Sequence, residues 1–312
     1  MQAFSKLTCV EREKLLEYPK GSIDIVLDTD AYNEVDDQFA IAYAFLTPEK
    51  FNVRAVYAAP FFNARSKGPK DGMEKSYDEI FRILDFLGVD GEGLVFRGAE
   101  RFMESKERAV RSPAMDDLVQ KAQSYSKEKP LYVVSIGAIT NVASAIVHDP
   151  SIIDKIVVVW LGGHAHDMDK TDEFNMKGDL IASQIVFDCG VALVQFPCNG
   201  VVSDLYTSTK ELREKLSGKS RLGTYLAKIV EDYIEESDED KKVIWDVAAL
   251  AWLINPGWID TKLVSCPAIS GGLTYEFDES RHLIRYAYKV DRKNILDDLF
   301  GKISGMEIKE EI

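Results

Sequence analysis

The chain has 312 residues, 46% of them hydrophobic, which is enough apolar material to bury a substantial core. Its formal net charge of -14 argues against nucleic acid or an anionic membrane as partner, because both need a basic surface. The four cysteines show no C-x-x-C pair and no histidine at zinc-ligand spacing, so we expect reduced thiols rather than disulfides or a structural zinc site.

The N-terminal segment and the longest apolar runs indicate where the protein resides. The first 20 residues mix charges throughout and lack the apolar centre of a signal peptide. No apolar stretch elsewhere approaches the roughly 18 residues that a membrane-spanning helix needs. We therefore expect a cytoplasmic protein.

Short apolar runs of strand length alternate along the chain with longer segments that have apolar residues at helical spacing. The predicted strands cover residues 23–27, 53–58, 131–136, 156–161 and 191–196, and the predicted helices cover 37–46, 77–87, 141–148 and 180–188. Residues 283–290 are predicted to add a strand or hairpin, and the acidic run 235–240 a solvated helix end. This order predicts an α/β fold, a single doubly wound, Rossmann-like open sheet, mostly parallel, with helices on both faces. No linker or repeat interrupts the series, so we expect residues 1–312 to form one domain.

Four aspartates cluster near the first predicted strand. The strand runs into Asp28 and Asp30, and after a short loop Asp36 and Asp37 open a helix. In an open parallel sheet the carboxyl ends of the strands face the ligand crevice. One such aspartate could simply cap the helix. Four carboxylates this close repel one another unless protons or a cation neutralise them, and hard oxygen ligands in that number suit Ca²⁺ or Mg²⁺.

Further motifs follow in a fixed order along most of the chain. They are Asn63 after the second predicted strand, VSIGAITN at 134–141, LGG at 161–163, EFN at 173–175 and Trp245-Asp246. Together with the opening aspartates, this order resembles the inosine-uridine preferring nucleoside hydrolase family. The resemblance implies hydrolysis of the N-glycosidic bond of ribonucleosides to free base and ribose.

The resemblance also implies roles for particular residues. Ca²⁺ would be held by Asp30, Asp37, the backbone carbonyl of Ile136, and Asp246. Ribose would be bound by Asp36, Asn63, Glu173 and Asn175, with Asp28 supporting the cluster from behind. Asp30 would act as general base on a water bound to Ca²⁺. A small nucleoside would be the substrate, and a homodimer or homotetramer the assembly.

The chain departs from the family pattern in three places. The loop 31–35 is two residues longer than usual, so Asn33 or Glu34 could enter the site. The segment 164–172 is shorter than usual and lacks the residues that contact the 5′-hydroxyl. Trp245 stands where the inosine-uridine type has a histidine that protonates the leaving base. We expect His164, His166 or, by stacking on the base, Trp245 to assist its departure.

Other interpretations stay open at this point. Singly, each later motif has a structural explanation, such as a helix cap at Thr140, Asn141 or Asp246, or a core position for Trp245. The strand ending in D-x-D also resembles a haloacid-dehalogenase-like, Mg²⁺-dependent phosphatase with Asp28 as nucleophile. A non-catalytic nucleoside or ribose binder is the third alternative. The sequence does not distinguish purine from pyrimidine bases.

Overall fold

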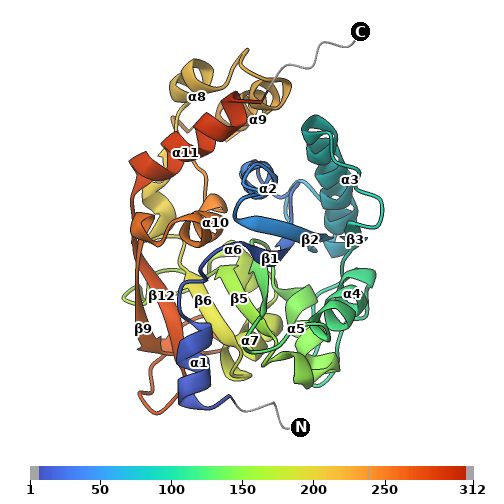
Figure 1. The fold of residues 1–312 in the computed structure, drawn as a ribbon, viewed down its shortest axis with the longest axis vertical. Helices are drawn as coiled ribbons and strands as arrows, with labels where there is room; N and C mark the ends of the chain where they lie inside the picture. The colour runs from blue at the N-terminus through green and yellow to red at the C-terminus, as the bar shows by residue number, and fades with distance from the viewer. Residues whose placement is uncertain (1–6, 238, 307–312) are drawn as a thin grey trace.

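A computed structural model describes residues 7–237 and 239–306, which surround an eight-stranded sheet of order β3-β2-β1-β4-β5-β6-β12-β9 (Figure 1). The strands are β1 (Ile23–Thr29), β2 (Phe51–Ala58), β3 (Val95–Arg97), β4 (Leu131–Ser135), β5 (Ile156–Leu161), β6 (Ala192–Phe196), β9 (Ile259–Ser265) and β12 (Leu283–Val290). Neighbouring strands are parallel except β9, which runs antiparallel to β12 at the sheet edge. The predicted α/β class and mostly parallel sheet are confirmed.

The predicted helices are present as α2 (Asp37–Phe45), α3 (Pro69–Leu87), α5 (Thr140–His148) and α7 (Leu180–Asp188). Helix α3 begins at Pro69 rather than at residue 77. Proline suits the first helical position because its φ angle is already helical and the N–H group that it lacks would have no partner within the helix. The other helices are α1 (Cys9–Leu15), α4 (Pro113–Ala122), α6 (Phe174–Gly178), α8 (Thr209–Lys215), α9 (Arg221–Ser237), α10 (Val247–Ile254) and α11 (Arg292–Ser304). Two small antiparallel ribbons pair β7 (Tyr206–Thr207) with β8 (Lys242–Val243), and β10 (Ala268–Ile269) with β11 (Tyr275–Glu276).

Helices cover both faces of the sheet, and each face has its own core. Along β5, Val157, Val159 and Leu161 belong to the core that also contains residues of α2, α3 and α10, whereas the alternate residues belong to the core that contains residues of α4, α5 and α7. The side chains of a strand point to opposite faces in turn, and both faces are apolar here because both are covered. Each fully buried leucine or valine contributes about 1.5–3 kcal/mol.

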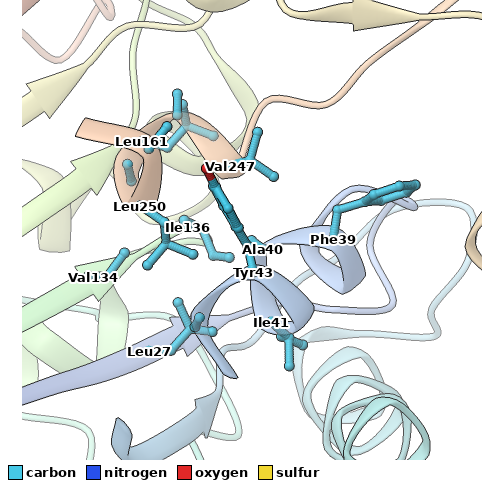
Figure 2. Close-up of a cluster of buried hydrophobic side chains, with 14 of the residues drawn as sticks. Leu27, Phe39, Ala40, Ile41, Tyr43, Val134, Ile136, Leu161, Val247 and Leu250 are labelled. Carbon is cyan, nitrogen blue, oxygen red and sulfur yellow. The ribbon is translucent and has the colours of Figure 1, made fainter. Parts of the chain in front are cut away.

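Helices α2 and α10 both pack over the central strands. In Figure 2, Tyr43 of α2 and Leu250 of α10 lie near Leu27 and Val134, which come from β1 and β4. This packing fixes the amino ends of α2 and α10, which begin directly after Asp36 and Asp246. The core thus places two parts of the predicted acidic site at the same edge of the sheet.

Three smaller expectations concern the surface and the thiols. The four cysteines form no disulfide in the described part of the chain, and the reduced state of the thiols stays a prediction. Described residues 235–237, which end α9, and 239–240 are exposed, so the acidic run forms a solvated helix end there; residue 238 lies outside the described residues. Across residues 7–237 and 239–306, no helix is long and apolar enough to cross a membrane.

Candidate active site

A cavity of about 230 Å³ opens at the carboxyl ends of the central strands. Its lining includes Asp30 after β1, Ile136 after β4, Leu161 of β5 and Cys198 after β6. Seven acidic side chains line it: Asp30, Glu34, Asp36, Asp37, Asp172, Glu173 and Asp246. The crevice therefore lies where the strand order predicts a ligand site in a doubly wound sheet.

Asp30 is the carboxylate that the protein leaves least satisfied. It is 1% exposed, and its Oδ2 is buried without a hydrogen-bond partner among the described residues. Burial, followed by the charges of Asp37 and Asp36, raises its pKa well above the ordinary value. A Cβ at Gly137 would lie 3.0 Å from the Asp30 Cγ, so glycine at this position allows the β4 loop to approach the carboxylate.

Asp36, Asp37 and Asp246 form the tightest carboxylate group, each offering an oxygen within 4.8 Å of the others. Burial and the charge of Asp36 raise the pKa of Asp37 to about 8, and burial raises that of Asp246. The donor set is buried and made of carboxyl oxygens, and it shares the cavity with Asp30, whose Oδ2 is unsatisfied. Such a set fits a hard divalent cation. Asp36 joins this group in addition to the ligands that the resemblance implies.

Asp36 precedes α2 but makes no side-chain cap hydrogen bond to the helix. Its Oδ2 accepts from the backbone N–H of Trp245 at 3.0 Å, and its Oδ1 pairs with Lys242 Nζ at 3.2 Å. Lys242 also contacts Glu34 Oε2 at 2.6 Å. Burial alone would lower the pKa of Lys242, but the charges of Asp36 and Glu34 reverse that effect and raise it. Lys242 is a site residue that the sequence reasoning missed, since its short strand carries no motif.

Glu173 and Asn175 are brought together at the start of α6. Glu173 accepts from the backbone N–H groups of Asn175, Met176 and Gly163 at 2.8–3.0 Å, so it caps α6 and holds the turn after β5. Asn175 Nδ2 donates to the carbonyls of Ile136 and Leu161 at 3.3 and 3.1 Å. Ile136, Glu173 and Asn175 all line the cavity.

Asp28 lies behind the cavity rather than in it. The side chain is fully buried and accepts from Ser135 Oγ at 2.9 Å and from Asn141 Nδ2 at 2.8 Å. Burial raises its pKa to about 6. Asn141 therefore ties β1 to α5 and does not cap the helix. A phosphatase nucleophile must reach substrate, so the phosphatase interpretation fails at Asp28.

Asn63 does not line the cavity, but its partner Asn33 does. Asn63 Nδ2 donates to Asn33 Oδ1 at 2.7 Å. The longer loop thus brings both Asn33 and Glu34 to the cavity wall, where the sequence reasoning expected one or the other.

The leaving-group candidates occupy different places. His164 and Trp245 line the cavity, whereas His166 does not. His166 Nε2 bonds Gln195 Oε1 at 2.9 Å and its ring packs on Tyr275 and Tyr286; burial lowers its pKa to about 4. Burial also lowers the pKa of His164. The Nδ1 of His164 accepts from the backbone N–H of Asn199 at 3.4 Å, which leaves Nε2 to carry the proton of the neutral ring.

Four further lining residues were absent from the sequence expectations: Asp172, Phe174, Cys198 and Asn199. Phe174 lies inside the EFN motif, which pointed to its neighbours only. The other three occupy loops without a recognisable pattern. Burial raises the pKa of Cys198 well above its ordinary value, so the thiol stays protonated in the cavity wall.

Comparisons with known proteins agree with this geometry. The sequence model of the family described as inosine-uridine preferring nucleoside hydrolase matches residues 25–297. Probable uridine nucleosidase 2 of Arabidopsis thaliana is 27% identical over 235 residues, covering 68% of this chain and 70% of the relative. Non-specific ribonucleoside hydrolase RihC of Salmonella paratyphi B is 25% identical over 258 residues, covering 76% and 80%.

A solved structure extends the likeness to the fold. The purine-preferring ribonucleoside hydrolase from Gardnerella vaginalis superposes with a TM-score of 0.73 at 21% identity, covering 90% of this chain and 98% of that chain. The family match spans the opening aspartates, the later motifs and Asp246. The chain therefore belongs to the inosine-uridine preferring nucleoside hydrolase family, a family of metal-dependent N-ribohydrolases.

Proposed function

We propose that this chain hydrolyses the N-glycosidic bond of ribonucleosides to free base and ribose, with Asp30 as general base and Ca²⁺ as the metal. The observation that carries the proposal is the buried, unpartnered Oδ2 of Asp30 in a cavity that six other acidic side chains also line. A carboxylate oxygen without a donor is available to accept a proton from water.

The ligands of Ca²⁺ would be Asp30, Asp37, Asp246 and the Ile136 carbonyl, with Asp36 close enough to join them. When bound, Ca²⁺ would supply Lewis-acid chemistry to water and to the sugar diol. Water adds to C1′ of the ribose, its proton passes to Asp30, and the C1′–N bond breaks with its electron pair going to the base. The remaining carboxylates stabilise the positive charge that develops on the sugar.

Ribose would be held by the residues that line or support the cavity wall. Asp36, Glu173 and Asn175 lie in that wall, and Asn63 acts on it through Asn33. Asp28 would hold β1 and α5 in register from behind. We propose His164, at the cavity wall, as the first source of a proton for the leaving base, with Trp245 as the alternative and His166, which lies outside the wall, after both.

The named relatives differ in the bases that their names mention: uridine, ribonucleosides without preference, and purines. A panel of uridine, cytidine, inosine, guanosine and adenosine is therefore the appropriate test, with reducing sugar as the readout and chelator as the control. Release of ribose from at least one nucleoside supports the proposal. Binding of nucleoside without any release would indicate the non-catalytic binder instead. The cytoplasmic location and the homodimer or homotetramer stay predictions.

A further inference from the structure

The loop 31–35 is held in place by contacts from several neighbouring elements. The carbonyl of Ala31 accepts from Gln38 Nε2 at 2.7 Å, and the backbone N–H of Tyr32 donates to Ser76 Oγ at 3.3 Å. Arg65 Nη1 donates to the Glu34 carbonyl at 2.9 Å. The longer loop is thus hydrogen-bonded to α2, α3 and the segment after β2, and Asn33 lies in the cavity wall.

The amide of Asn63 has a fixed polarity. Its Oδ1 accepts from the backbone N–H of Arg65 at 2.8 Å, and a backbone N–H can only donate. The other end of the amide is therefore the NH₂ group, which donates to Asn33 at 2.7 Å. The atom of Asn33 that receives this bond must be its Oδ1.

The same logic determines which end of Asn33 remains open. Asn33 is 8% exposed and lines the cavity, and its Oδ1 is occupied by Asn63. Its Nδ2 has no hydrogen-bond partner in the described part of the chain. This NH₂ group belongs to a residue that lines the cavity, so its two protons are available to a ligand or water that accepts them.

We infer that Asn33 Nδ2 donates a hydrogen bond to a ribose hydroxyl oxygen of the substrate, and that Asn63 is a positioning residue that sets the direction of this amide. This inference rests on the proposed nucleoside hydrolysis. A sugar hydroxyl in this cavity meets many carboxylates, which only accept hydrogen bonds when ionised. A hydroxyl that donates to a carboxylate still has oxygen lone pairs, and these need a donor.

Two of the other side-chain donors near the proposed ribose site are already occupied. Both bonds of Asn175 Nδ2 go to backbone carbonyls, and Lys242 Nζ is shared among Glu34, Asp36 and the Val243 carbonyl. The backbone N–H of Asn33 donates to the Asp30 carbonyl at 2.6 Å, so Asn33 stands directly beside the proposed general base. Its amide is therefore well placed to reach the sugar.

The test compares Asn33→Ala and Asn63→Asp with wild type. Aspartate at 63 can still accept from the Arg65 N–H but cannot donate to Asn33, so Asn33 would turn its NH₂ group away from the substrate. We expect each variant to lower kcat/KM for uridine about 5- to 10-fold, the value of one neutral hydrogen bond, mainly through KM. The double variant should lose no more than Asn33→Ala alone, because both changes remove the same bond.

The inhibition constants of 2′-deoxy-, 3′-deoxy- and 5′-deoxyuridine identify the acceptor. The effect of Asn33→Ala should disappear for the one analogue that lacks the contacted hydroxyl. An equal effect on all three analogues, additive losses in the double variant, or wild-type kcat/KM in Asn33→Ala would overturn the inference.

Two controls separate this role from a structural one. Asn52→Asp makes the same amide-to-acid change on an exposed side chain of β2, which donates to Ser22 Oγ at 3.1 Å, and it should leave KM unchanged. If Asn33→Ala melts at a lower temperature, Asn33→Ser repeats the measurement with a smaller cavity. If wild type releases no ribose, the proposed function fails, and calorimetric binding of uridine to wild type and Asn33→Ala then decides the inference alone.

Discussion

Asp30 differs from the neighbouring carboxylates because the fold gives its Oδ2 no donor. Asp36 and Asp37 accept from Lys242 and Thr29, and Glu173 accepts from three backbone N–H groups. An oxygen left open at full burial is destabilising for the isolated chain. A metal ion or the attacking water that binds Asp30 Oδ2 would remove this cost.

Replacing Asp30 by Asn tests the role of general base, because asparagine keeps an oxygen ligand but cannot take a proton. We expect kcat for uridine to fall at least about 100-fold while nucleoside still binds. Steady-state rates together with calorimetric binding of uridine check this. Turnover at the wild-type rate in Asp30→Asn would exclude Asp30 as the base.

His164 is the histidine that reaches the cavity, and His166 offers a matched control in the same segment. If His164 protonates the leaving base, His164→Ala should slow uridine hydrolysis about 100-fold and spare a nitrophenyl riboside, whose leaving group departs as a stable anion. Because burial lowers the pKa of His164, its acidic form becomes scarcer as the pH rises. The ratio of uridine to nitrophenyl riboside rates should therefore fall as the pH rises through the His164 pKa, which lies below the ordinary histidine value.

The control His166→Ala should leave that ratio unchanged, since the ring faces Gln195 and the tyrosines. Equal losses of both substrates in His164→Ala would show that His164 positions the sugar. In that case Trp245→Ala becomes the next variant, with the same pair of substrates.

At the scale of elements, Lys242 joins two segments that form the site. It links the loop before α2, through Glu34 and Asp36, to the segment that leads into α10. Lys242→Met leaves buried carboxylate without its partner, which typically costs about 3 kcal/mol or more. We expect a lower free energy of unfolding, measured with urea, and a smaller increase in that free energy when Ca²⁺ is added.

The neighbouring Lys241 provides the control for this change. It is exposed and lies over the Tyr206 ring at 4.5 Å. Lys241→Met should alter stability by no more than about 0.5 kcal/mol. Similar losses in both variants would show that Lys242 acts only through net charge.

The sequence was most informative about the elements whose pattern is local. The central strands and α2, α5 and α7 were predicted within a few residues, because buried strands are short apolar runs and helices repeat at their own period. The strand pairing at the sheet edge could not be predicted from the sequence. Strand β12 pairs with β6 in parallel and with β9 in antiparallel, and such pairings depend on tertiary contacts rather than on a local pattern.

The site residues likewise divide into those that lie in local motifs and those that only tertiary contacts bring together. Residues carried by ordered motifs, such as Asp30, Glu173, Asn175 and Asp246, reach the cavity. Lys242 escaped prediction because its partner Glu34 is 208 positions away along the chain. Asn63 was expected to contact the sugar or the water directly. In the structure Asn33, from the longer loop, lines the cavity and Asn63 donates a hydrogen bond to it.

At the scale of the whole molecule, the site concentrates negative charge inside a chain that is already acidic, with a formal net charge of -14. A carboxyl group whose pKa is higher in the folded than in the unfolded chain destabilises the fold when it ionises. Burial raises the pKa of Asp37 to about 8, against about 3.9 for an unfolded aspartate. The loss of folding stability caused by ionised Asp37 is therefore absent below about pH 4 and complete only above about pH 8.

Without Ca²⁺, Asp37→Asn should consequently stabilise the protein more at pH 8 than at pH 5. We expect the difference to exceed about 1.4 kcal/mol, the equivalent of one pKa unit. Urea unfolding at both pH values in the presence of chelator measures it. A stability difference that is the same at pH 5 and pH 8 would mean that Asp37 ionises in the folded protein as it does in the unfolded chain.

The central claim is that one carboxylate cluster both binds the metal and supports hydrolysis. The most direct measurement is the rate of ribose release from uridine or inosine against free Ca²⁺ concentration, for wild type and Asp37→Ala. We predict a saturable rise for wild type, matched by calorimetric Ca²⁺ binding, and neither turnover nor tight binding for Asp37→Ala. Ribose release at the full rate in excess chelator, or unchanged Ca²⁺ affinity in Asp37→Ala, would contradict it.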